Sequence, residues 1–145
     1  MIGPKHGVFL LDEWAPRTQS LNVCRAILKH AMQCGLTQDS KLLVHCVLGV
    51  SRSTAVAMGL EASLGLDPSV AWQRVYQARP VAWPSIALMG CFDDLLGFGG
   101  NLTEVALRID QWRRGFDRVI CGPKSPVSEF DSGAGKLPGL SILEE

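Results

Sequence analysis

Residues 44–54 read VHCVLGVSRST, and the rest of the chain is interpreted outward from this stretch. An apolar run at 41–45 (KLLVH) leads into it and predicts a buried strand, whereas the alanine-rich run at 52–64 predicts a helix. Residues 46–51 then form a tight turn between the two elements. In α/β folds, a loop between a strand and a helix is a common place for an anion to bind.

The five residues between Cys46 and Arg52 are enough to curl into an anion cradle. In such a curl, successive backbone N–H groups point at one tetrahedral anion. Gly49 permits a backbone angle that a side chain would resist, and the helix that begins near Arg52 directs its positive end into the cradle. The residues predicted to bind phosphate are Val47, Leu48, Gly49, Val50, Ser51 and Arg52.

The side chains of this stretch predict nucleophilic chemistry at Cys46. A cysteine at a helix N-terminus can have a pKa of about 3.5–7.5, and a thiolate beside a bound phosphate ester can attack phosphorus. The planar guanidinium of Arg52 can bind two phosphoryl oxygens. Ser53 can donate a hydrogen bond to the sulfur, and His45 is expected to stabilise the conformation of the loop. Alternatively, Cys46 ends a buried strand and Arg52 is a surface residue. His45, Gly49 and Ser53 together favour the catalytic interpretation.

The same stretch resembles the HCxxGxSRS loop of the dual-specificity branch of the protein tyrosine phosphatases. The likeness covers roughly residues 9–96 and includes 78–80 (ARP) and 84–85 (PS, where PN is usual). In that family, the cysteine that matches Cys46 forms a phospho-cysteine intermediate and the arginine that matches Arg52 binds phosphate. The resemblance therefore implies an enzyme that acts on a phosphorylated protein and needs no metal or other cofactor.

Such an enzyme needs a general acid that protonates the leaving oxygen and later activates water. The resemblance implies an aspartate about thirty residues before the cysteine, on a loop after a strand, and Asp12 follows the apolar run 7–11 (GVFLL). Glu13 is the alternative, and Asp39 is too close to the strand that leads into the loop. In the simpler interpretation, Asp12 only ends the strand. Trp14 lies in the same loop, where it could help to shape substrate access; a purely structural role is the alternative.

The alternation of strands and helices predicts an α/β domain with a mainly parallel sheet flanked by helices. Helices are expected at roughly 20–33, 52–64, 67–78, from after 85 to 96, and 102–114. Because two visible strands make a weak parallel sheet, the N-terminal strands of the domain are expected to be missing. The domain is predicted over 1–118, with a partial domain as the alternative, and the Gly-, Pro- and Ser-rich segment 119–145 is predicted to be a disordered tail.

Composition narrows the classes of partner. The 14 basic and 14 acidic residues balance, so no net charge steers the chain toward nucleic acid or anionic lipid. No apolar run reaches the ~18 residues of a membrane span, and the first residues do not resemble a secretory signal, so a cytoplasmic location is predicted. The odd count of five cysteines argues against a disulfide framework. The oligomeric state stays open.

Three functions are compatible with the sequence. The first is hydrolysis of phosphotyrosine, with phosphoserine and phosphothreonine as further candidates. The second is a phosphate-binding module that is catalytically weak or inactive. The third is sulfur transfer or arsenate reduction, which the pattern at 45–53 fits less well. Val47, Leu48 and Val50 bring no lysines to neutralise several phosphates, so a monophosphate on a protein side chain is favoured over inositol phosphates.

Overall fold

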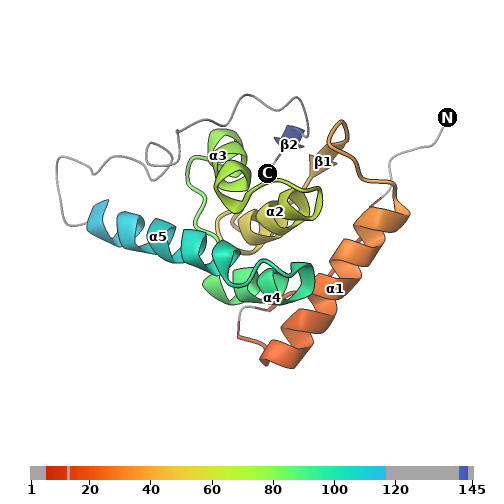
Figure 1. Cartoon of the computed structure of the whole chain (residues 1–145), viewed down its shortest axis with the longest axis horizontal. Helices are drawn as coiled ribbons and strands as arrows, with labels where there is room; N and C mark the ends of the chain where they lie inside the picture. Colours follow the sequence, from red (N-terminus) through yellow and green to blue (C-terminus); the bar gives the residue numbers. More distant parts are fainter. Residues whose placement is uncertain (1–5, 13, 117–140, 144–145) are drawn as a thin grey trace.

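The computed structural model describes residues 6–12, 14–116 and 141–143. In these residues the helices are α1 (Arg17–Gln33), α2 (Arg52–Ser63), α3 (Pro68–Ala78), α4 (Ile86–Leu96) and α5 (Asn101–Phe116). The strands are β1 (Lys41–Leu43) and β2 (Ser141–Leu143), which pair in parallel (Figure 1). Apart from 141–143, the predicted disordered tail (119–145) lies outside the described residues.

The predicted α/β fold with a mainly parallel sheet is wrong, because the described part of the chain is mainly helical. Strand structure there is confined to β1 and β2, which have three residues each. The run at 7–11, expected as a buried strand, has no regular secondary structure, and the side chains of Val8 and Leu10 are each 88% exposed. Phe9 and Leu11 pack against the core. An apolar run becomes a strand only where a neighbouring strand takes its backbone hydrogen bonds, and no described strand pairs with 7–11.

Capping residues explain why the helices begin and end close to where the sequence predicts. At the start of α3 the Asp67 carboxylate accepts a hydrogen bond from the Ser69 N–H at 2.9 Å. The N-cap of α4 is Ser85, and this helix ends at Gly97, whose φ of 72° lies in the left-handed region that glycine tolerates. These signals are local in the sequence, which is why sequence patterns can locate them.

The start of α1 differs from the prediction. The helix begins at Arg17 rather than at Ser20, because the Pro16 carbonyl already accepts hydrogen bonds from the N–H groups of Gln19 (2.9 Å) and Ser20 (3.1 Å). Ser20 is buried within the first turn of the helix. Pro16 therefore stands directly before the helix, in a position where its missing N–H costs nothing.

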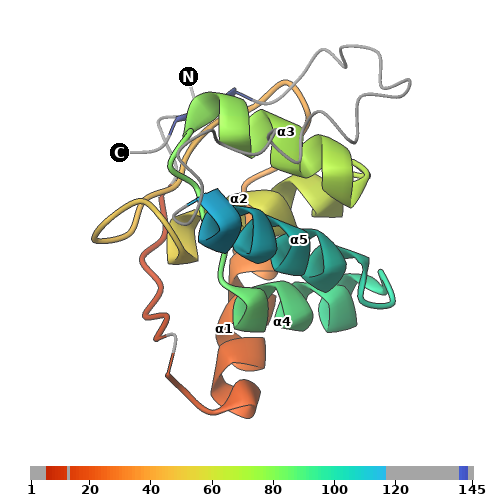
Figure 2. The same ribbon diagram turned by 90° about the vertical axis from the view of Figure 1, so that its left-hand side faces the viewer.

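α2 is the central helix of the fold. Every residue of 53–62 is buried, and α1, α3 and α4 pack around this helix (Figures 1 and 2). A helix that is buried on all sides needs small residues where its neighbours come close. A Cβ atom at Gly59 would lie 2.6 Å from the ring of Phe92 on α4. The 46–51 loop thus leads into a helix that its surroundings hold in place.

α5 is fixed to α4 at its first turn. The buried carboxylate of Asp93 accepts hydrogen bonds from the N–H groups of Leu102 (2.9 Å) and Thr103 (2.8 Å) and from the Thr103 hydroxyl (2.6 Å). Because the first N–H groups of a helix have no partners within it, this carboxylate anchors the start of α5. Among the described residues, no helix combines the length and the apolar character that crossing a bilayer requires.

Candidate active site

The 46–51 loop lies between β1 and α2, in the place where the sequence predicts it, and projects from the body of the molecule (Figure 2). Gly49 is buried and has a φ of 63°, the left-handed conformation for which a glycine is needed. The side chains of Val47 and Leu48 face solvent and are 83% and 75% exposed. The predicted strand at 41–45 is shorter in the structure and ends at Leu43.

Arg79 holds one side of this loop from the C-terminal end of α3. Its Nε donates a hydrogen bond to the carbonyl oxygen of Gly49 at 3.0 Å, and its Nη2 donates to that of Leu48 at 3.2 Å. Both carbonyl groups therefore point toward Arg79. The sequence had marked residues 79–80 only as part of the family likeness, without a role for the arginine.

The next two carbonyl groups of the loop are also held. The Val50 oxygen accepts hydrogen bonds from the Trp83 N–H (2.8 Å) and the Thr54 hydroxyl (2.6 Å). The Ser51 oxygen accepts from the Ser85 N–H (3.3 Å) and from the same hydroxyl of Thr54 (3.1 Å). In a trans peptide the C=O and the following N–H point in opposite directions. The N–H groups of residues 49–52 are consequently turned away from these supports, as an anion cradle requires.

The sulfur of Cys46 lies beside one of these N–H groups, that of Gly49. The N–H of Gly49 donates to Sγ at 3.3 Å, and the hydroxyl oxygen of Ser53 lies 3.4 Å from it. Burial alone raises the pKa of the Cys46 thiol, but hydrogen bonds from the Ser53 side chain and from the backbone at Ser53, Gly49 and Leu48 outweigh it and lower the pKa from 9.0 to about 7. Hydrogen bonds of this kind favour the thiolate because they stabilise its charge.

We expect alkylation of Cys46 by iodoacetamide to reach half of its maximal rate near pH 7, since the thiolate is the reacting form and its pKa is about 7. At pH 7 about half of the Cys46 side chains are thiolates and react at half of the maximal rate, whereas a cysteine with a pKa near 9 is about 1% ionised at that pH. Mass spectrometry of the Cys46 peptide follows the reaction. The buried Cys24, whose pKa is raised to about 12, serves as the unreactive control. A midpoint near pH 9 at Cys46 would contradict the hydrogen-bonded thiolate.

Arg52 connects the loop to the segment that carries the predicted general acid. Its Nη1 donates a hydrogen bond to the carbonyl oxygen of Leu11 at 3.1 Å, so residues 11 and 12 reach the edge of the loop. Asp12 is exposed and accepts a hydrogen bond from the Trp14 N–H at 3.0 Å. Trp14 itself is 91% exposed beside it. Glu13, the alternative acid, lies outside the described residues.

The structure does not give His45 the loop-ordering role that the sequence predicts for it. His45 is exposed, and within the described residues its imidazole makes no hydrogen bond to the loop. The contacts that hold the loop come instead from Arg79, from Thr54 and from the backbone at Trp83 and Ser85. One sequence signal could have found Arg79: it precedes a proline, which ends the helix there and leaves the guanidinium free to turn toward another segment.

No protein-family model matches the chain, no curated protein matches it, and no solved structure matches it.

Proposed function

We propose that this chain is a cysteine-dependent phosphatase that hydrolyses phosphomonoesters on protein side chains, phosphotyrosine first and phosphoserine or phosphothreonine as further candidates. One observation carries the proposal. Four consecutive carbonyl groups, those of residues 48–51, accept hydrogen bonds from outside the loop, so that the N–H groups of residues 49–52 are turned away from these supports. One of them, the N–H of Gly49, donates to Sγ of Cys46, whose pKa is about 7. A nucleophile and an oxyanion-binding cradle then share one loop.

The proposed reaction has two steps. Cys46 Sγ attacks phosphorus, an S–P bond forms, and the bond from phosphorus to the ester oxygen breaks as Asp12 gives that oxygen a proton. Water then attacks phosphorus, the Asp12 carboxylate takes a proton from this water, and the S–P bond breaks to release phosphate and the thiolate. Arg52 and the loop N–H groups hold the phosphoryl oxygens, and Ser53 donates to the departing sulfur. Neither step calls for a metal ion.

The surroundings of the loop support a monophosphate substrate. Val47 and Leu48 occupy its exposed rim, and Trp14 stands on the neighbouring segment. An apolar rim accepts the ring of a phosphotyrosine more readily than a ligand with several phosphates, whose charges would need additional cations. Faster initial rates on a phosphoinositide than on phosphotyrosine peptides would contradict this assignment.

A phosphate-binding module without catalysis is the second candidate function. The observation that favours it is the lack of strand structure at 7–11, because a strand there would fix the position of Asp12. The two functions separate in one assay, hydrolysis of an aryl phosphate at about pH 6 with EDTA present. A folded chain that binds inorganic phosphate yet releases no product would be a module.

The Asp12→Asn variant is expected to lose about 10²-fold in kcat on phenyl phosphate, because the amide has no proton to give to the leaving oxygen. The loss should be smaller on 4-nitrophenyl phosphate, whose leaving group is a weak base. Initial rates with both substrates measure the difference. Asp39→Asn is the matched control and should act like the wild type. Activity that survives Asp12→Asn but falls in Glu13→Gln would transfer the role to Glu13.

A further inference from the structure

The segment between α3 and α4 is held by α5 from one side. The Nη2 atom of Arg113 on α5 donates hydrogen bonds to the carbonyl oxygens of Pro80 (2.5 Å) and Ala82 (2.9 Å). Ala82 is buried, and its N–H donates to the Arg79 carbonyl at 2.9 Å, which closes a turn at this point. One guanidinium group therefore fixes the backbone of residues 80–82.

A carboxylate on the same helix fixes the next residue. Asp110 accepts a hydrogen bond from the indole N–H of Trp83 at 3.0 Å through Oδ1, and one from Nε of Arg114 at 2.8 Å through Oδ2. The Arg114 guanidinium also lies 6.0 Å from the centre of the Trp83 ring. The side chain of Trp83 is thus attached to α5 while its backbone N–H faces the 46–51 loop.

The same short segment supplies the supports of the loop. Its backbone N–H groups at Trp83 and Ser85 hold the Val50 and Ser51 carbonyls, and Arg79 at its start holds two more. Arg79, Trp83 and Ser85, which hold the 46–51 loop, therefore each lie within a few residues of a contact to Arg113 or Asp110. A continuous series of hydrogen bonds leads from α5 to the groups around Cys46.

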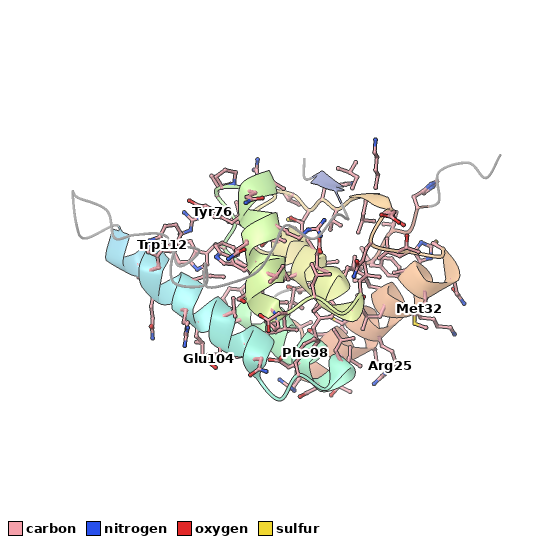
Figure 3. The ribbon with its side chains drawn as sticks, turned by 45° about the horizontal axis from the view of Figure 1, so that its top comes forward. Arg25, Met32, Tyr76, Phe98, Glu104 and Trp112 are labelled. Carbon is pink, nitrogen blue, oxygen red and sulfur yellow. The ribbon has the colours of Figure 1, made fainter. Side chains whose placement is uncertain are left out.

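α5 itself is firmly placed. Trp112 of α5 lies edge-on against Tyr76 of α3, with ring centres 6.0 Å apart (Figure 3). The Arg113 guanidinium lies 4.5 Å from the centre of the Trp112 ring. Burial lowers the pKa of Arg113, which reflects the cost of taking this cation partly out of water. A fully exposed arginine would keep its hydration and would not show this lowered pKa.

We propose that Arg113 and Asp110 are positioning residues for the 46–51 loop, and that they act through residues 80–85. The inference deepens the proposed phosphatase function and rests on it. Without the two contacts, residues 80–83 would lose their attachment to α5, and the carbonyls of Val50 and Ser51 would lose a fixed donor. The N–H groups that face Cys46 would then be less well aligned.

The test compares Arg113→Gln with Arg108→Gln, which removes an arginine from the same helix that pairs with Glu104. Arg113→Gln is expected to lower kcat on an aryl phosphate by about 3- to 30-fold, and to raise the pH midpoint of Cys46 alkylation by about 0.5–1 unit. Arg113→Lys, which keeps a donor, should recover part of both changes. Arg108→Gln should match the wild type in both.

Thermal unfolding of each variant shows whether it folds. If Arg113→Gln does not, Trp83→Phe provides the test, because it removes the indole N–H that Asp110 accepts while the backbone N–H to Val50 stays. It should shift kcat and the midpoint in the same directions. Folded variants that match the wild type would overturn the inference alone. A wild type that lacks activity and alkylates with a midpoint near pH 9 would instead overturn the proposed function.

Discussion

The Cys46→Ser variant is expected to lose aryl phosphatase activity by roughly 10⁴-fold or more, because a serine hydroxyl stays protonated where the Cys46 thiol, with its pKa of about 7, ionises. The loop around residue 46 is held by contacts to Arg79, Thr54 and Trp83, and none of these involves the sulfur. Binding of inorganic phosphate should therefore survive. Initial rates at about pH 6 with EDTA, together with calorimetric titration of phosphate, measure both properties.

Cys34→Ser is the matched control for this experiment. Cys34 is half-buried and directly follows α1, with its sulfur 3.5 Å from Nε2 of His30, and it lies outside the 46–51 loop. Its replacement should leave the rate unchanged. If Cys46→Ser retained wild-type activity, Cys46 would not be the nucleophile and the phospho-cysteine mechanism would fall. Loss of phosphate binding along with activity would mean that the sulfur is part of the cradle itself.

The helices could be read from the sequence because their boundaries depend on neighbours in the chain. Asp67 caps α3 through a residue two positions away, and Gly97 ends α4 by its own backbone conformation. The sheet could not be read in this way. A strand forms only if a distant segment pairs with it, and the apolar pattern at 7–11 carries no information about such a partner. Its two exposed apolar side chains, Val8 and Leu10, show that the pattern alone was misleading.

The candidate site was predictable to the extent that it is local. Cys46, Gly49 and Ser53 lie within eight residues, so their mutual contacts follow from one tight loop. Apart from the Thr54 hydroxyl, the supports of that loop were missed, because they come from about thirty residues downstream and partly from backbone N–H groups. Almost every residue type carries a backbone N–H, so the sequence at Trp83 does not indicate that this N–H donates a hydrogen bond to the Val50 carbonyl.

Buried charge was likewise invisible in the sequence. Glu61 looks like an ordinary polar residue on an alanine-rich helix, yet its side chain is fully buried in α2. Arg74 of α3 lies 3.3 Å from it, and burial raises the pKa of Glu61 to about 7 although the arginine opposes this. Which side of a helix meets another helix is decided by tertiary packing, and α2 has neighbours on every side.

The Arg52→Lys variant is expected to lose about 10²- to 10³-fold in kcat/KM, although it keeps the positive charge. A lysine is a point charge and lacks the planar fork that can bind two phosphoryl oxygens at once. It would also have to replace the hydrogen bond from Nη1 to the Leu11 carbonyl, which attaches the Asp12 segment to the loop. Initial rates on 4-nitrophenyl phosphate and the affinity for inorganic phosphate measure the effect.

Arg25→Lys is the matched control, because Arg25 lies exposed on α1 and contacts Asn22 of the same helix (Figure 3). It should match the wild type in both measurements. The alkylation midpoint of Cys46 should move little in Arg52→Lys, since the hydrogen bonds that lower its pKa come from Ser53 and the loop backbone. A variant with unchanged kcat/KM would show that charge alone at position 52 is sufficient. The fork would then have no part in the reaction, and phosphate would be held by the loop N–H groups.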